Sequence, residues 1–234
     1  MDVFLEIRKD LRHHSTKKHR EASLRFFKEH VNPYGVRHEQ MRDLLKKYTP
    51  VVREIGAKEY LPVAEKLLAD GWFEEGELAI KLMENFEKDY DQTTMKLFEK
   101  WVDDYIKNWA HCDWFCTRLV GRLIEKDPSL AAEVVHWTKS RNRWKRRASA
   151  VSFVLHARKG RFLDYVFLVA ETLLHDKNDM VQKGVGWMLK EATKSNEAEV
   201  VEFIRQRKHN MPRTMLRYAI EKLPTKLRKE LMEK

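Results

Sequence analysis

Apolar residues recur at spacings of three and four in segment after segment of this chain. An α-helix turns once in about 3.6 residues, so this spacing places the apolar side chains on one face of a helix. No segment shows a sustained alternation of apolar and polar residues, and the 234 residues include only 8 Gly and 6 Pro. The pattern therefore predicts an all-α fold. Three of the predicted buried stripes consist of Leu61, Ala64, Leu67 and Leu68; of Leu78, Leu82 and Phe86; and of Cys116, Leu119, Val120, Leu123 and Ile124.

Helix-start signals separate the apolar segments. Asp127 precedes Pro128, as a capping residue precedes a proline in the first turn, and Asn196 begins a pattern that resembles a capping box. Pro212 and Pro224 mark two further starts. These signals predict about twelve helices of roughly 10 to 18 residues, joined by short links.

Many short helices without a sheet favour stacked helical pairs over a four-helix bundle. We therefore expect an α-solenoid of HEAT-like helical repeats. Because no linker-like stretch divides the sequence, we expect a single domain over residues 1–234.

Positive charge is concentrated in the second part of the chain. The sequence has 46 Lys and Arg against 36 Asp and Glu, a formal net charge of +10. Residues 139–234 hold 23 basic and 11 acidic residues, which leaves 23 and 25 for residues 1–138. This asymmetry predicts a concave basic surface that binds a polyanion, for which nucleic acid is the default. A membrane surface is the weaker candidate, because no helix divides cleanly into a basic and an apolar face.

Other features restrict the compartment and the cofactors. The charged N-terminal residues predict no signal peptide, and the most apolar stretch, residues 162–174, is interrupted by two carboxylates. Cys112 and Cys116 stand four apart and would face the same side of a helix, which suits neither a disulfide nor a closed metal site. We expect reduced core thiols, no metal, no cofactor and a monomer.

Trp187 has an unusual place in the helix predicted from about residue 180 to residue 193. At about 100° per residue, its indole falls roughly 150° from the middle of the apolar stripe, beside Lys183 and Lys190. An aromatic ring flanked by cations is typical of a surface that binds nucleic acid. The alternative is a second packing surface against a neighbouring helix, and this helix alone does not decide between the two. The expected stripe consists of Val181, Val185, Met188 and Leu189.

A second aromatic segment runs from Trp101 to Trp114. Its first part predicts a packing stripe at the end of a helix, which we expect Asn108 to terminate. Trp109 and Asp113 then precede a helix that should begin at about Trp114. Asp113 has a structural interpretation as the cap of that helix, where a carboxylate contributes about 1 kcal/mol. A cap uses one carboxylate oxygen, so this interpretation is compatible with a chemical role.

The basic run RNRWKRR, residues 141–147, predicts a helix that begins at about Asn142. Arg143 and Arg147 would lie one turn apart on its flank, and two guanidiniums in register suit phosphate oxygens. Lys145 and Arg146 point elsewhere, and we expect them to solvate the helix. The buried stripe of this helix should consist of Trp144, Ala148, Val151 and Leu155.

The unusual residues are spaced like successive repeats. Trp109 and Arg147 are 38 positions apart, and Arg147 and Trp187 are 40 apart, which matches one HEAT-type helical pair. The spacing favours equivalent places on one concave wall, together with Asp113. The set lacks a nucleophile triad, a glycine-rich phosphate loop and a cluster of metal ligands.

One carboxylate is too few for hydrolysis of a neutral glycoside, which usually needs a second carboxylate to protonate the leaving group. A leaving group that is already cationic needs no general acid, and an N3- or N7-alkylated purine is such a group. The sugar that becomes an oxocarbenium ion needs a nearby anion, and indole faces attract cations.

At these residues the sequence resembles the AlkD-type DNA glycosylases, the HEAT-like-repeat DNA alkylation repair family. The resemblance spans most of the chain. Four stretches carry it: RFFKEHVNPYGVRHEQMRDLLK (residues 25–46), NWAHCDWF (108–115), RWKRRASAV (143–151) and VQKGVGWMLKE (181–191).

The resemblance implies removal of cationic N3- and N7-alkylated purines from double-stranded DNA in base excision repair, without flipping of the damaged base. Trp109 and Trp187 would flank the deoxyribose, and Asp113 would stabilise the oxocarbenium ion and position the water. A cytoplasmic, nucleoid-associated location follows from this role. The residues expected to bind DNA are Arg143, Arg147, Lys183, Lys190 and Phe26.

The sequence departs from the family pattern at three positions. Phe26 stands where a tyrosine is expected, Leu155 where a lysine can occur, and Lys190 where an arginine is expected. These changes bear on DNA affinity and on the range of lesions.

Two other functions are compatible with a basic helical surface. The first is a non-catalytic HEAT-like scaffold that binds nucleic acid or a protein partner, but such a scaffold has no use for a carboxylate between two indoles. The second is an RNA-binding module, which the charge does not exclude.

Overall fold

The computed structural model describes residues 2–233. These residues form helices joined by turns; no β-strand occurs among them, and an isolated bridge joins Asn32 to Trp72. The all-α fold predicted from the sequence is confirmed. The chain packs as two compact units, Met1–Leu119 (unit 1) and Val120–Lys234 (unit 2). A single domain over the whole chain stays a prediction.

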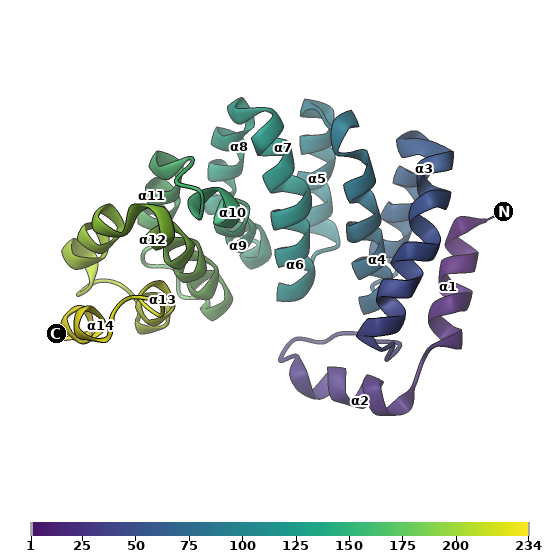
Figure 1. The fold of residues 1–234 in the computed structure, drawn as a ribbon, viewed down its shortest axis with the longest axis horizontal. Helices are drawn as coiled ribbons and strands as arrows, with labels where there is room; N and C mark the ends of the chain where they lie inside the picture. The colour runs from purple at the N-terminus through teal and green to yellow at the C-terminus, as the bar shows by residue number, and fades with distance from the viewer. Residues whose placement is uncertain (1, 234) are drawn as a thin grey trace. The chain divides into compact units, whose positions relative to one another are not determined.

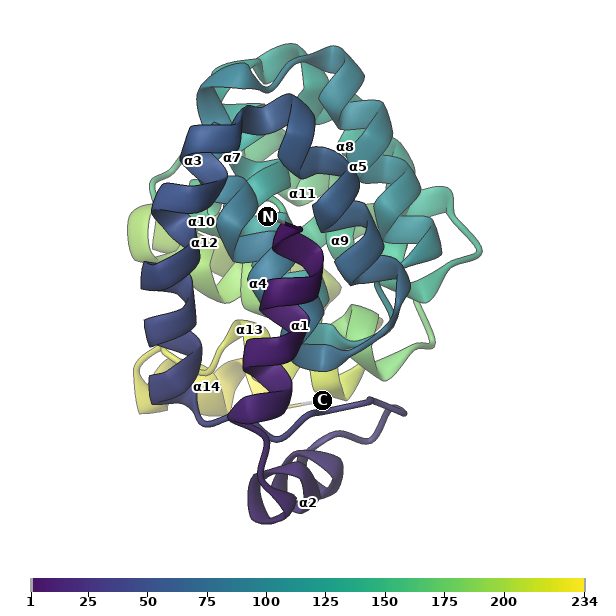
Figure 2. The ribbon, with the colours of Figure 1, turned by 90° about the vertical axis from the view of Figure 1, so that its right-hand side faces the viewer.

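Unit 1 is built around α4, which packs against α1, α3 and α6. The helix α2 lies beyond the ends of α1 and α3 in both views (Figures 1 and 2), and none of its residues is buried. The elements of unit 1 are α1 (Val3–His13), α2 (Lys17–Phe26), α3 (His38–Ala69), α4 (Phe73–Met83), the 3₁₀ helix η1 (Glu84–Asp89), α5 (Gln92–Asp104) and α6 (Trp109–Phe115).

Unit 2 is built around α12, which packs against α9, α10, α11 and α13. Its elements are α7 (Gly121–Lys126), the 3₁₀ helix η3 (Pro128–Leu130), α8 (Ala131–His136), the 3₁₀ helix η4 (Trp137–Lys139), α9 (Arg143–Val151), α10 (Val154–Ala157), α11 (Leu163–Thr172), α12 (Asp179–Arg207), α13 (Arg213–Ala219) and α14 (Thr225–Met232). A π-helical turn, η2 (Cys116–Val120), follows α6.

Most of the predicted stripes form the cores of the two units. All residues of the second and third stripes are buried, as are the two cysteines, which are free thiols. Leu155 is an exception: its exposed fraction is 37%, so its predicted burial is wrong. The helix predicted to run from about Asn142 through Leu155 is interrupted by a turn at Ser152 and Phe153, between α9 and α10. Phe153 is buried there, whereas Leu155 is not.

The predicted helix-start signals are confirmed. Asp127 caps the turn that begins with Pro128, and Pro212 and Pro224 immediately precede α13 and α14. Asn196 leaves helical geometry inside α12 and separates two helical segments, so a helical segment starts there as predicted. Gly56 likewise leaves helical geometry inside α3, with a φ of 82°, so the 32-residue span of α3 consists of two shorter helical segments. The shortest helix, α10, has 4 residues, fewer than expected.

Among the described residues, no helix combines the length and the apolar character that a membrane crossing needs.

Candidate functional site

Asp113 lies inside α6 and does not cap it. The helix begins at Trp109, because the Asn108 side chain caps it by accepting a hydrogen bond of 2.8 Å from the His111 backbone N–H. The predicted cap at Asp113 and the predicted start at about Trp114 are therefore wrong. Capping no longer accounts for the carboxylate at this position.

Trp109 and Asp113 are one turn apart on α6, so their side chains share one face of the helix. Both residues are half-buried, as is Trp114, whereas the remaining residues of α6 are sealed in unit 1. The structure thus brings the predicted carboxylate and one predicted indole together at a partly accessible surface. The sealed positions are Ala110, His111, Cys112 and Phe115.

Trp109 contacts the end of α2. The ring centroid of Trp109 lies 5.8 Å from that of Phe26 and 5.5 Å from that of Phe27. Phe26 has an exposed fraction of 66%, which is high for a large apolar side chain. A pocket of about 450 Å³ opens beside these rings. It is lined by Ala22, Ser23, Phe26, Phe27, Val36, His38, Met41, Phe73, Glu74, Glu77, Trp109, Ala110 and Trp114.

Two glutamates of α4 line this pocket, and the sequence analysis missed both. Glu77 is buried and forms an ion pair with Lys81, whose ammonium lies 4.7 Å from the centroid of the Trp114 ring. Glu74 is buried and precedes Leu78 by one turn. A carboxylate in phase with a predicted apolar stripe was the signal that could have revealed it.

His111 supports α6 from inside unit 1. Its imidazole stacks on Phe73 with ring centroids 5.0 Å apart, and its Nε2 lies 2.8 Å from the Phe73 carbonyl oxygen. Burial lowers the pKa of His111 to about 4, so the ring is neutral near pH 7 and Nε2–H donates to that carbonyl. We assign His111 a structural role, in which it anchors the helix that carries Trp109 and Asp113.

Arg147 is buried, whereas Arg143 is exposed. The Arg147 guanidinium donates a hydrogen bond of 2.5 Å to the Met180 carbonyl, and its side chain packs against Gly184. The Arg143 guanidinium lies 4.7 Å from the ring centroid of Trp144. Arg147 is therefore directed at α12 and Arg143 at Trp144, and the binding of phosphate by these two guanidiniums stays a prediction.

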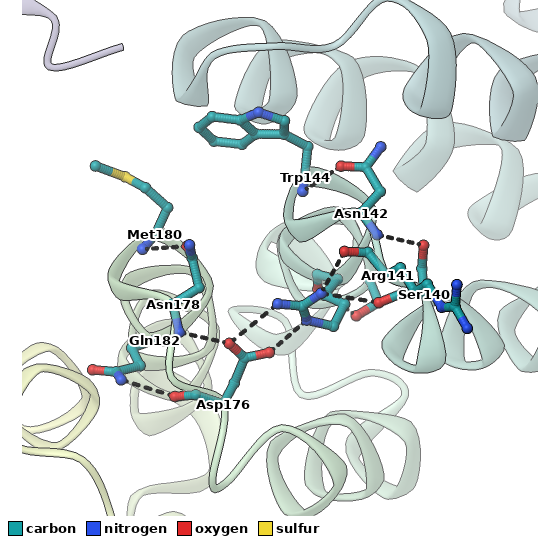
Figure 3. A network of polar contacts seen from close by, with 10 residues as sticks. Ser140, Arg141, Asn142, Trp144, Asp176, Asn178, Met180 and Gln182 are labelled. Atoms are coloured by element: carbon teal, nitrogen blue, oxygen red, sulfur yellow. Dashed lines mark hydrogen bonds and ion pairs between the residues drawn. The ribbon is translucent and has the colours of Figure 1, made fainter.

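Arg146 has a structural contact that the sequence analysis did not anticipate. Its Nε donates to a carboxylate oxygen of Asp176 at 2.6 Å, and its Nη1 donates to the carbonyls of Ser140 and Arg141. Asp176 also accepts a hydrogen bond from the Asn178 backbone N–H (Figure 3). The expectation that Arg146 merely solvates the helix is wrong, because it joins the segment before α9 to the segment before α12.

Trp187 is half-buried, and the predicted apolar stripe of its helix is fully buried. Its two lysine neighbours are paired: Lys183 with Asp179 at 2.6 Å, and Lys190 with Glu221 at 3.0 Å. Next to Trp187, Gly186 packs so closely on α13 that a Cβ would lie 2.5 Å from the Cβ of Tyr218. Besides the side that carries its apolar stripe, α12 therefore has a second side that packs against a neighbouring helix. The alternative interpretation of Trp187, as a packing residue, requires such a second side.

A larger pocket, of about 780 Å³, lies between α11 and the second half of α12. It contains none of the predicted site residues. Among residues 2–233, no three His, Cys, Asp or Glu side chains are grouped as metal ligands.

No curated protein sequence matches this chain significantly. A solved structure, the "Predicted DNA alkylation repair enzyme from Enterococcus faecalis", is similar in fold, with a TM-score of 0.81 and 14% sequence identity. The match covers 90% of this chain and 97% of that structure. The profile of the DNA alkylation repair enzyme family matches residues 7–223, nearly the whole chain. The chain therefore belongs to the family of DNA alkylation repair enzymes.

Proposed function

We propose that this enzyme is a DNA glycosylase that hydrolyses the N-glycosidic bond of cationic N3- and N7-alkylated purines in double-stranded DNA. Family membership supports a role in the repair of alkylation damage, with DNA as the partner. The observation that carries the finer proposal is that Asp113 and Trp109 lie one turn apart on a partly accessible face of α6. When a cationic base leaves, the carboxylate can stabilise the positive charge that develops on the sugar, and the indole face attracts both cations.

The reaction needs no general acid in this proposal. The C1′–N bond breaks with its electron pair moving to the alkylated base, which leaves as a neutral purine. The sugar becomes an oxocarbenium ion, which the Asp113 carboxylate stabilises. A water molecule that Asp113 positions then attacks C1′ and loses a proton to that carboxylate or to solvent. The Trp109 indole face attracts the cationic base and the cationic sugar by roughly 0.5 to 2 kcal/mol each.

The DNA remains stacked in this proposal, without flipping of the damaged base. Trp187 lies against the deoxyribose, and Phe26 contacts the duplex from the end of α2. Arg143, which is exposed, binds phosphate directly, whereas Lys183 and Lys190 must first exchange their carboxylate partners for phosphates. Arg147 acts on DNA through the segment that it fixes at the start of α12.

The direct test is release of 7-methylguanine from a methylated duplex under single-turnover conditions, with detection of the free base. Asp113→Asn preserves the size of the side chain and removes its charge. We expect at least about a hundredfold loss of the release rate, because the charge acts only as the sugar becomes cationic, while the affinity for DNA changes little. Asp103→Asn, on α5, is a control that removes one carboxylate outside the proposed site.

Equal release by the wild type and by Asp113→Asn would remove the enzymatic role of this carboxylate. Binding of duplex DNA without any base release would instead favour the non-catalytic scaffold. Tighter binding of RNA than of duplex DNA would favour an RNA-binding module.

A further inference from the structure

The segment between α2 and α3, residues 27–37, is held by one buried carboxylate. Glu74, in the first turn of α4, accepts hydrogen bonds from three successive backbone N–H groups. The distances are 2.8 Å from Tyr34, 2.8 Å from Gly35 and 3.1 Å from Val36. With an exposed fraction of only 3%, Glu74 is shielded from water, so these N–H groups are the donors that compensate its burial.

Neighbouring contacts fix the same segment from other directions. The Tyr34 hydroxyl donates to Glu75 at 2.6 Å, and the Tyr34 ring stacks on Trp72 with centroids 4.3 Å apart. The Phe73 N–H donates to the Asn32 carbonyl at 2.9 Å. The start of α4 is therefore a rigid support against which this segment lies.

The segment also holds the start of α2. Gly35 has a φ of 87°, and its carbonyl accepts a hydrogen bond of 3.1 Å from the N–H of Thr16, the residue that caps α2. A Cβ at Gly35 would lie 2.4 Å from the backbone nitrogen of Arg20. The backbone at residues 34–36 thus contacts both α4 and α2.

The helix α2 has no buried residue of its own. Burial of α2 side chains therefore contributes little to its position, which depends on residues 34–36 and on the aromatic contacts at its end. At that end Phe26 and Phe27 lie against Trp109, the indole next to the proposed catalytic carboxylate.

We infer that Glu74 is a positioning residue: its three backbone hydrogen bonds keep the end of α2, and with it Phe26 and Phe27, against Trp109. The inference rests on the proposed function only where it concerns base release. The placement of the rings is tested separately.

The test uses Glu74→Gln in the full chain. Glutamine keeps the size of the side chain but presents an NH₂ group to one of the three N–H donors, so at least one bond is lost. The first readout is the indole N–H resonance of Trp109, assigned with Trp109→Phe. We expect it to shift as the ring currents of Phe26 and Phe27 change, while the resonances of the buried Trp101 and Trp137 stay in place. Amide hydrogen exchange at residues 32–37 should accelerate at least about tenfold.

The second readout is base release. At saturating enzyme, we expect about tenfold slower single-turnover release by Glu74→Gln, with the affinity for undamaged duplex within about threefold of the wild type. Glu54→Gln is the matched control, because Glu54 is an exposed glutamate of the same unit and the charge change is the same. It should move neither readout.

An unchanged Trp109 resonance together with unchanged exchange at residues 32–37 would overturn the inference. If the wild type releases no base, the proposed function fails, while the resonance and exchange measurements still decide the placement. If Glu74→Gln does not fold, Glu74→Asp takes its place, because the shorter carboxylate cannot reach all three N–H groups. It should shift the Trp109 resonance as well; no shift there overturns the inference too.

Discussion

The Lys190 ammonium lies 3.0 Å from a carboxylate oxygen of Glu221, although Lys190 was predicted to contact DNA. The hydrogen bond from Lys190 lowers the pKa of Glu221, so the carboxylate is ionised at neutral pH. Lys183 is paired in the same way with Asp179. A phosphate that binds either lysine therefore has to displace a carboxylate of the protein itself.

Removal of that competing carboxylate should strengthen DNA binding. For Glu221→Gln we expect a threefold to tenfold higher affinity for duplex DNA at low salt, and a steeper salt dependence, by about one counterion. Glu197→Gln is the control: Glu197 is an exposed glutamate of the same unit, and its substitution makes the same change in net charge. Equal gains in DNA affinity for the two variants would mean that the change in net charge strengthens binding, and not the release of Lys190 from its ion pair.

The two arginines of α9 should behave differently. Arg143 is exposed, so Arg143→Ala should lower the salt slope of DNA binding by about one and change stability by less than about 0.5 kcal/mol. Arg147 is buried and bonded to Met180, so Arg147→Ala should lower the free energy of unfolding by about 1 to 3 kcal/mol. Urea unfolding and DNA titrations over a range of salt measure both. A lower salt slope for Arg147→Ala than for Arg143→Ala would contradict the assignment.

These arginines also show how far the sequence determines the site. Helical periodicity places Arg147 correctly on the flank of α9, but its partner, Met180, is 33 residues away. Local patterns contain no information on such a contact, so exposure was the natural expectation. The same holds for Arg146 and Asp176, which are 30 residues apart.

The misplaced start of α6 has a local cause. Asn108 and Asp113 are both good capping residues, and each precedes apolar residues. Propensity does not choose between them. In the structure the buried face of α6 packs on α4, with His111 bonded to the Phe73 carbonyl, and this contact requires the turn that begins at Trp109. The residues of the buried stripes, by contrast, can be predicted from helical periodicity alone. Most of them are buried as predicted, with Leu155 as an exception.

Stability should fall in mild acid because of His111. Burial lowers its pKa from 6.5 to about 4, so between these values the unfolded chain binds a proton that the folded chain does not. The free energy of unfolding therefore decreases as the pH falls from about 6.5 to about 4, by roughly 3 kcal/mol at the lower end for this residue.

The contribution of His111 is isolated by His111→Gln, whose amide can still donate to the Phe73 carbonyl. We expect the variant to be less stable than the wild type near pH 7 and the difference to narrow towards pH 4. His156, whose pKa burial also lowers, is present in both proteins and cancels. A difference in stability that is constant from pH 7 to pH 4 is incompatible with this assignment.

The contact between α12 and α13 gives the sharpest prediction on packing. At Gly186 a Cβ would lie 2.5 Å from the Cβ of Tyr218 and 2.7 Å from the Met215 carbonyl oxygen, so Gly186→Ala forces the two helices apart. We expect a loss of about 1 to 3 kcal/mol in urea unfolding, although alanine is the better helix former. Gly184→Ala, in the same helix, is the control. A Cβ at Gly184 would lie no closer than 3.1 Å to another atom, and that atom is the Cγ of the Arg147 side chain. That change should cost clearly less, since a side chain yields where a backbone carbonyl does not.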